Sequence, residues 1–211
     1  PSLKRRLFAN FMARDDALSD ELYAEKKRTL FGGLTGRILE IGPGTGVNLR
    51  FLDSGVEWIG IEPNEAMHPY LRKKAADLGI EVQLETGMSE QMQVPDNSVD
   101  AVISTLVLCS VDDLCATLDE VLRVLKPGGR FVFLEHVADK PWTARLMVQK
   151  IVPFTPWRYF SDGCNPGRRI SDAIRKAGFA EVEVHDYMQE GPGIILAINR
   201  PHIFGTAMKA A

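Results

Sequence analysis

The stretch "ILEIGPGTGVN", Ile38 to Asn48, joins a short apolar run to three alternating glycines. A dinucleotide-binding turn needs the spacing G-x-G-x-x-G, and Val47 stands where its last glycine would be. A phosphate-binding loop ends in Gly-Lys-Ser/Thr, and no lysine follows Gly46. The turn therefore predicts a strand and a loop whose backbone closely approaches a bulky ligand that is not held by phosphates.

A single acidic residue supplies the second half of this signal. Glu62 lies 20 residues after Gly42, in "GIEPN", at the end of the next predicted strand. A carboxylate in that position can accept hydrogen bonds from both hydroxyls of an adenosine ribose. The pairing of "LEIGPGTG" with "GIEPN" therefore indicates an adenosine-containing cofactor.

Composition and charge limit the class of protein. The 211 residues suffice for one domain with a full core, and 45% hydrophobic with 25% charged residues is typical of a globular protein. A formal net charge of -3 gives no reason to expect a nucleic acid partner. The three cysteines form no CxxC pair, which predicts a reducing compartment, no disulfide framework and no metal site.

Strand and helix signals alternate along the chain. Buried strands are predicted at "RILEI", "VEWIGIE", "IEVQLETG", "SVDAVISTLVL" and "RFVFLEHV". Helices are predicted at residues 3–12, 15–30 and 64–79, near Val47, and after Asp112, which we expect to cap the helix that "KPGG" ends. This alternation predicts an α/β fold: a doubly wound, Rossmann-like and mostly parallel sheet of about seven strands, with helices on both faces.

With these motifs the sequence resembles the class I S-adenosylmethionine-dependent methyltransferases. The resemblance covers residues 36–137, where "VPDNSVDAVIS" and "LDEVLRVLKPGGRFVFLEH" match segments usual in quinone-type methyltransferases. A closer resemblance extends over nearly the whole chain. "TLVLCSV", "LKPGG", "EHV", "FSDGCN" and "RPHIFG", in this order, look like the methyltransferase-like alkyl-thiol methyltransferases, a family associated with endoplasmic reticulum and lipid-droplet membranes.

The resemblance implies a function and its alternatives. It implies S-adenosyl-L-methionine as the cofactor and a small apolar acceptor, which is a thiol in the closer family. Methylation of a quinone, a phenol or a phospholipid headgroup is the alternative within enzymes, because the motifs of the superfamily do not depend on the acceptor. A cofactor-binding scaffold without turnover is the alternative outside enzymes.

The resemblance also implies where the cofactor binds. The implied residues are Glu40, Gly42, Gly44, Gly46, Asn48, Glu62, Pro63, Met88, Ser89, Glu90, Thr105 and Leu106. Glu40 either organises the turn near the cofactor's amino group or is an ordinary capping carboxylate. After the third strand the family commonly has a "GD" pair whose acid binds adenine, and here Met88 follows Gly87. Met88 can then only pack on the adenine ring, and Glu90 either takes the polar role or lies in the first turn of a helix.

The acceptor side is expected at the ends of the fourth and fifth strands and in the late segments. Candidate substrate-binding residues are Cys109, His136, Trp157, Tyr159 and His202, and candidate catalytic residues are His136 and Asp162. Cys109 is either a reactive thiol or a small buried hydrophobic residue. His136 is either a general base or a histidine that fixes its loop, and His202 has the same ambiguity. Asp162, in "DGCN", either takes part in the chemistry or caps the following helix and holds a lid shut.

Two segments are predicted to cover the site. Residues 1–35 form N-terminal helices that act as a lid on the methyltransferase domain at 36–211, and residues 141–169 form an aromatic insertion that covers the substrate. The basic start beside Leu3 and Leu7 also suits an anionic membrane surface. No stretch is apolar enough to span a bilayer and no signal peptide is visible. We therefore expect a cytoplasmic protein or one that contacts a membrane peripherally, with the oligomeric state and an anchor ahead of Pro1 left open.

Overall fold

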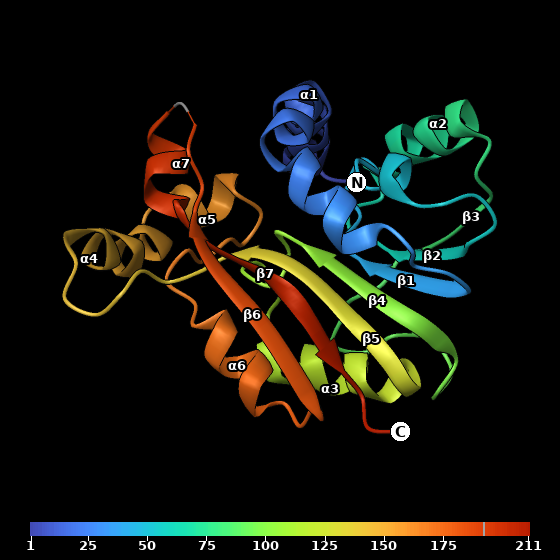
Figure 1. Ribbon diagram of the computed structural model, residues 1–211. Helices are drawn as coiled ribbons and strands as arrows, with labels where there is room; N and C mark the ends of the chain where they lie inside the picture. The colour runs from blue at the N-terminus through green and yellow to red at the C-terminus, as the bar shows by residue number, and fades with distance from the viewer. Residues whose placement is uncertain (192) are drawn as a thin grey trace.

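One sheet runs through the computed structural model, which describes residues 1–191 and 193–211 and, for Leu18 and Ser19, the backbone only (Figure 1). Its strands within these ranges are β1 (Arg37–Ile41), β2 (Glu57–Ile61), β3 (Val82–Glu85), β4 (Val99–Thr105), β5 (Leu125–His136), β6 (Glu181–Met188) and β7 (Pro201–Met208). The order is β3-β2-β1-β4-β5-β7-β6, parallel from β3 to β5, and β7 runs antiparallel to both of its neighbours. The predicted doubly wound, mostly parallel, seven-stranded sheet is confirmed.

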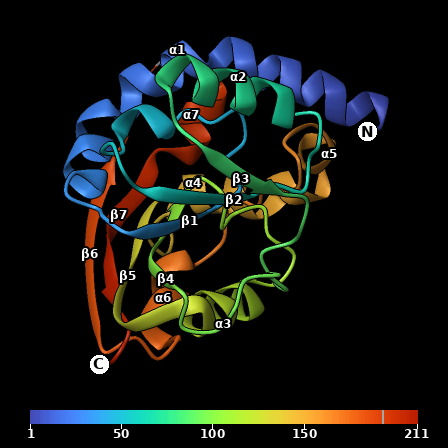
Figure 2. The ribbon, with the colours of Figure 1, turned by 90° about the vertical axis from the view of Figure 1, so that its right-hand side faces the viewer.

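Helices cover both faces of this sheet (Figures 1 and 2). They are α1 (Leu3–Phe31), α2 (His68–Leu78), α3 (Leu114–Val124), α4 (Ala144–Ile151), α5 (Trp157–Phe160), α6 (Ile170–Lys176) and α7 (Ile194–Asn199), with 3-10 turns η1 (Leu49–Phe51) and η2 (Val152–Phe154). The helices α1 and α2 lie over one face, and α3 and α6 lie over the other (Figure 1). The helices α4, α5 and α7 gather beyond the carboxyl end of β5.

Two apolar cores, one on each face, hold the helices to the sheet. Successive residues of β1 enter opposite cores, because side chains alternate along a strand. Ile38 packs in the core that includes Leu71 of α2. Leu39 packs in the core that includes Leu118 of α3 and Ile174 of α6. Burial on both faces explains why apolar residues occupy successive positions of β1, at Ile38 and Leu39.

The prediction of two N-terminal helices is wrong, because α1 is one continuous helix of 29 residues. Acidic residues in its middle have partners outside the helix. Asp16 accepts a hydrogen bond from the Thr45 hydroxyl at 2.6 Å and pairs with Lys74, and Asp20 pairs with Arg50 at 2.8 Å. Among the described residues, neither α1 nor any other helix is long and apolar enough to cross a membrane.

Two smaller predictions are also wrong. A helix does not begin near Val47, because the chain turns as far as Asn48 and then forms only the short η1. Asp112 does not cap α3. The cap is Asp113, whose carboxylate accepts hydrogen bonds from the backbone N–H groups of Cys115 and Ala116 at 2.9 and 3.1 Å.

Candidate active site

The three glycines of the turn after β1 have different surroundings. Gly42, Gly44 and Gly46 all have positive φ, at 59°, 55° and 82°, which favours glycine at each position. A Cβ at Gly42 would lie 2.6 Å from Val107, and one at Gly46 would lie 3.0 Å from Leu71. A Cβ at Gly44 would have no atom of the other described residues, its two chain neighbours aside, within 4 Å. Gly42 and Gly46 therefore allow close packing, whereas Gly44 borders open space, as expected of the position that a ligand approaches.

The buried carboxylate of Glu62 fixes this turn to the end of β2. One oxygen accepts a hydrogen bond from the Gly44 N–H at 2.9 Å, and the other accepts from the Asn64 N–H at 2.8 Å. Burial raises the pKa of Glu62, and the two hydrogen bonds oppose that shift. The structure thus places Glu62 directly beside the open space at Gly44, where the sequence predicts the ribose of the cofactor.

Glu40, on β1, fixes the same glycine turn through side-chain hydrogen bonds. Its two oxygens accept hydrogen bonds from the side chains of Asn48 at 2.8 Å and Trp58 at 3.0 Å, and Asn48 also donates to the Thr105 hydroxyl at 3.0 Å. Glu40 is therefore no ordinary capping carboxylate. The Oδ1 atom of Asn48 is buried without a hydrogen-bond partner among the described residues, which leaves an acceptor for the amino group of the expected cofactor. The site fits that cofactor.

Lys27 of α1 is a fully buried residue that the sequence does not indicate. Its Nζ has no hydrogen-bond partner within the part of the chain that the structure describes. Burial lowers the pKa of Lys27, while the negative charges of Asp20 and Glu40 oppose the shift. A lysine in a helix that carries many charged residues gives no sequence signal of burial, so only the folded chain reveals that α1 brings a cation towards Glu40.

The segment after β3 carries the predicted adenine-side residues Met88, Ser89 and Glu90. Ser89 is buried, with its hydroxyl 3.1 Å from that of Thr117. Glu90 lies in a turn, not in a helix, and its Oε1 accepts hydrogen bonds from the Asp112 and Asp113 N–H groups at 2.7 and 3.1 Å. These bonds hold the loop ahead of α3. Met88 is half exposed, which leaves its side chain available to pack on an adenine ring.

The carboxyl end of β4 is held in an unusual conformation. Leu106 has a φ of 57°, which costs energy for a residue with a side chain, and its N–H donates to the Leu134 carbonyl at 2.9 Å. The fully buried Glu135 accepts hydrogen bonds from the N–H groups of Val107 and Leu108, both at 3.2 Å, and burial raises its pKa to about 7. Glu135 had no role in the sequence-based predictions, although an acid at the end of a buried strand is the signal that indicated Glu62.

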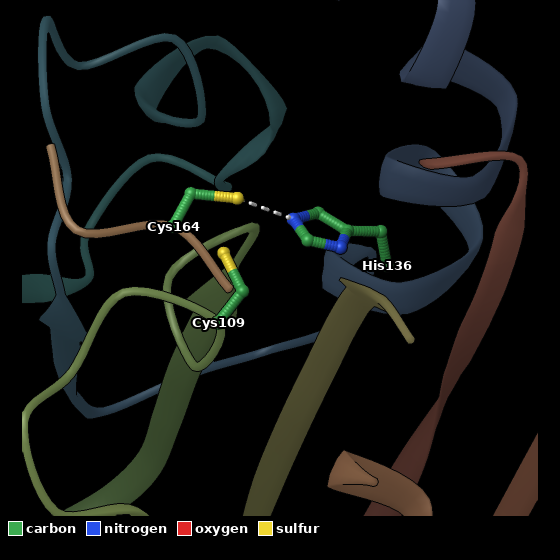
Figure 3. A group of neighbouring side chains, drawn as sticks. All are labelled: Cys109, His136 and Cys164. Carbon is green, nitrogen blue, oxygen red and sulfur yellow. Dashed lines mark hydrogen bonds between the residues drawn. The ribbon is translucent and has the colours of Figure 1, made fainter. Parts of the chain in front are cut away.

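Three residues from separate segments meet beside this loop (Figure 3). Cys109, His136 and Cys164 are buried, and one potential ligand atom from each lies within 4.8 Å of the other two. The Sγ atom of Cys164 is 3.4 Å from Nε2 of His136, and within the described residues both cysteines are free thiols. The predicted acceptor residues Cys109 and His136 are thus brought together, and Cys164 joins them.

His202 lies close to His136 but its ring nitrogens are engaged elsewhere. Nδ1 donates to the Arg200 carbonyl at 3.1 Å, so Nε2 accepts from the Tyr23 hydroxyl at 3.1 Å. Burial lowers the pKa of His202 to about 3, which keeps the ring neutral. Of the two sequence-based alternatives, the geometry favours a histidine that fixes its surroundings, because it ties β7 to α1.

The residues expected on the insertion point in different directions. Trp157 is half-buried against the core, whereas Tyr159 is exposed, with the Lys4 ammonium 4.5 Å from its ring centroid. Asp162 lies 3.7 Å from the same ammonium. The prediction that Asp162 caps the following helix is wrong, since α6 begins after Arg169.

The helix α1 crosses the cofactor edge of the sheet (Figure 2). Near its beginning, Arg5 donates to the Pro63 carbonyl at 3.0 Å, and the Arg5 carbonyl accepts from the Asn64 side chain at 3.2 Å. Further along, Asp16 accepts from Thr45 in the glycine turn at 2.6 Å. One helix therefore contacts two of the loops that carry predicted cofactor residues, the glycine turn and the loop after β2.

The buried position of Glu40 predicts how stability depends on pH. Burial raises the pKa of Glu40 to about 7, whereas an unfolded glutamate titrates near ~4.3. Protonated Glu40 therefore stabilises the folded state. Its contribution to the unfolding free energy is fully present below the unfolded pKa and is lost as the pH rises through the folded pKa. In the cofactor-free protein, the unfolding free energy of the wild type relative to Glu40→Gln should fall by on the order of 3 kcal/mol between pH 4 and pH 8.

Denaturant unfolding at a series of pH values measures this difference. Lost hydrogen bonds to glutamine give an offset that does not change with pH, so only the slope is diagnostic. The variant Glu81→Gln, at an exposed position, is the matched control and should follow the wild type. A Glu40→Gln difference that stays constant with pH would contradict a raised pKa.

Comparison with known proteins agrees with this geometry. Residues 39–133 match the model of a methyltransferase domain family. Thiol S-methyltransferase TMT1A from Homo sapiens is 36% identical over 97% of this chain and 87% of its own length. Thiol S-methyltransferase TMT1B from Mus musculus is 36% identical over 96% of this chain and 86% of its own.

Solved structures share the fold. Geranyl diphosphate C-methyltransferase from Streptomyces coelicolor A3(2), solved with S-adenosyl-L-homocysteine, matches with a TM-score of 0.69 at 16% identity, over 89% of this chain and 76% of its own. YcgJ from Bacillus subtilis matches with a TM-score of 0.69 at 16% identity, over 90% and 99%. The cofactor is S-adenosyl-L-methionine, and the chain belongs to the thiol S-methyltransferase family of TMT1A and TMT1B, among the S-adenosylmethionine-dependent methyltransferases.

Proposed function

We propose that this protein transfers the methyl group of S-adenosyl-L-methionine to the sulfur of a small apolar thiol. The observation that carries the proposal is the extent of the similarity to TMT1A, which covers 97% of the chain, whereas the match to the general methyltransferase domain ends at residue 133. The chain after residue 133 carries His136, Cys164 and the helices α4 and α5, which lie at the acceptor side. Similarity in that part supports a shared class of acceptor.

Methyl transfer from this cofactor requires little of the protein beyond positioning the acceptor. The cofactor supplies a methyl group on a positively charged sulfur, so the chain's residues have to align an acceptor in line with it and exclude water. Correct orientation can contribute on the order of 7 kcal/mol. A thiol with a pKa of about 8.5 is already a few per cent thiolate at neutral pH, which reduces the need for a strong base.

Each cofactor residue then has a role that its geometry permits. Glu62 accepts hydrogen bonds from the ribose hydroxyls, and the backbone at Gly44 lies against the ligand. The free Oδ1 of Asn48 accepts from the amino group, and Met88 packs on the adenine. Leu106, at the carboxyl end of β4, borders the methyl group. These assignments are supported by the burial of Glu62 and Asn48 and by the open space at Gly44.

We also propose that α1 and residues 141–169 close over the acceptor. The two segments already meet through Lys4, which contacts both Tyr159 and Asp162. Closure of these segments would keep water from the sulfonium and favour an apolar nucleophile. Opening them would admit the acceptor without disturbing the sheet.

The same two segments supply a surface for peripheral membrane contact. At the start of α1, Leu3 is 73% exposed and Leu7 is 59% exposed, and in the insertion Phe154 is 90% exposed and Phe160 is 72% exposed. Basic residues accompany them at positions 4–6. Apolar side chains next to basic ones suit an anionic bilayer surface, to which each basic residue adds about 1 kcal/mol. An apolar acceptor dissolved in a membrane would then lie close to the cover.

Membrane contact can be tested by flotation with phosphatidylserine-containing vesicles. The wild type should float with them, and the double variant Leu3→Ser/Leu7→Ser should float less, because the apolar contact is lost. Leu78→Ser, at a 47% exposed position of α2, is the matched control and should behave as the wild type. Equal flotation of all three proteins would argue against this surface.

Cofactor binding by Glu62 can be tested by calorimetry with S-adenosyl-L-homocysteine. Glu62→Gln removes a charged acceptor worth about 1.5–3 kcal/mol, so the affinity should fall roughly tenfold or more. Glu65→Gln, an exposed position three residues along the same loop, is the matched control and should bind normally. If Glu62→Gln binds as tightly as the wild type, Glu62 is not a ribose ligand.

The acceptor class can be tested with methyl-labelled cofactor and matched acceptors. A short-chain alkyl thiol should yield labelled thioether, whereas the alcohol of the same carbon skeleton, a phenol and phosphatidylethanolamine vesicles should yield none. The rate should rise with pH up to the pKa of the thiol, because the thiolate is the nucleophile. Turnover of the phenol or the lipid without turnover of any thiol would contradict the proposal, and no turnover of any acceptor would favour a scaffold.

A further inference from the structure

Two thiols and an imidazole converge beside the carboxyl ends of β4 and β5 (Figure 3). Cys109 follows β4, His136 ends β5, and Cys164 comes from the loop after α5. One ligand atom from each lies within 4.8 Å of the others, and Figure 3 shows the two sulfur atoms on the Nε2 side of the imidazole. A metal ion that bonds sulfur at about 2.3 Å and nitrogen at about 2.0–2.1 Å holds its ligand atoms at separations similar to, or slightly shorter than, those between these three side chains.

We infer that Cys109, His136 and Cys164 bind Zn²⁺, and that the fourth coordination position takes the sulfur of the acceptor thiol. The second part of this inference rests on the proposed function, whereas the first does not. The ligands come from three separate segments of the chain, which explains why the spacing of cysteines in the sequence predicts no metal site.

The ligand set and its burial favour zinc. Thiolate and imidazole are ligands that Zn²⁺ prefers, and two cysteines with one histidine form a catalytic type of site that leaves a fourth position open. All three side chains are buried, so a charged complex there would be costly. Two thiolates neutralise the two charges of Zn²⁺, and binding releases two protons from the thiols to solvent.

The backbone around the three ligands is held before any metal binds. The Asn165 N–H donates to the Cys109 carbonyl at 2.9 Å, which ties the Cys164 loop to the loop after β4. Arg168 strengthens that link, because its guanidinium donates to the Leu108 carbonyl at 2.9 Å. The Arg168 carbonyl accepts from the Ala138 N–H at 2.9 Å, just after His136. All three ligand segments are thus connected, as a preorganised site requires.

A disulfide between the two cysteines is the main alternative. Both cysteines are free in the structure. A disulfide would use only the two sulfur atoms and would give no role to the imidazole nitrogen, which lies 3.4 Å from Cys164. The convergence of three ligand atoms, not two, favours a metal ion.

Zinc at this place would activate the acceptor. Cys109 lies three residues after Leu106, which borders the proposed methyl position. The acceptor thiol loses its proton to solvent as its sulfur bonds to the metal, which increases the thiolate fraction at neutral pH. The sulfur then forms a bond to the methyl carbon while the bond from that carbon to the cofactor sulfur breaks, and the electron pair stays on the cofactor sulfur. The neutral thioether is a weaker ligand and leaves.

Metal analysis of the purified full chain under a reducing agent tests the site directly. The protein should bind one Zn²⁺ per chain in a titration against a chromophoric chelator. The variants Cys109→Ser, Cys164→Ser and His136→Ala should each weaken binding by more than the roughly 10–100-fold that loss of an outer partner costs. Cys115→Ser, an exposed cysteine on α3, is the matched control and should bind as the wild type.

Cobalt substitution gives a readout that does not depend on the variants. Co²⁺ in the wild type should show thiolate charge-transfer absorption and the strong visible bands of a four-coordinate site, and the acceptor thiol should change both. No metal binding by the folded wild type, or a Cys109–Cys164 disulfide that persists under reductant, would overturn the site. A cobalt spectrum unchanged by the thiol would overturn the fourth-ligand role.

Assays of zinc binding and of thiol methylation separate the metal site from the proposed function. If metal-free protein methylates thiols as fast as zinc-loaded protein, the metal-bound acceptor is excluded and the thiol methyltransferase function stands. If the protein binds Zn²⁺ but methylates no thiol, the metal site stands, and the proposed function fails together with the role of the fourth position.

Discussion

Buried carboxylates at the carboxyl ends of β2 and β5 hold the loops of this site in place. Glu62 and Glu135 each accept hydrogen bonds from backbone N–H groups of the loops that line the ligand edge. A buried carboxylate without such donors would be costly, so the loops must keep the conformation that supplies them. Leu106 can keep a strained backbone for the same reason, because the loop around it is fixed on both sides. The geometry of the site thus follows from satisfying buried charge.

The sheet and the cofactor edge could be predicted from the sequence because their signals are local. A buried strand in parallel arrangement is a short apolar run, and a turn with positive φ at several positions requires glycines. The acid that follows the second strand is also a local signal, which is why the position of Glu62 could be predicted, whereas the role of Glu40, inside β1, was implied by the family resemblance. Both lie where the sequence analysis expects the cofactor, with Gly44 beside open space.

The rest could not be predicted because it depends on contacts between distant segments. The middle of α1 is polar, but Asp16 and Asp20 have partners on other elements, so the helix continues. Lys27 resembles an exposed lysine in sequence and is buried only because α1 packs on the sheet. The convergence of Cys109, His136 and Cys164 is likewise a product of the fold, since no spacing in the chain relates them.

A structure of the protein with S-adenosyl-L-homocysteine bound would show whether cofactor and acceptor meet at the carboxyl end of β4. We expect the ribose hydroxyls on Glu62 and the cofactor sulfur beside Leu106, facing the cluster of Cys109, His136 and Cys164. A cofactor whose ribose lies away from Glu62, or whose sulfur points away from that cluster, would contradict this expectation.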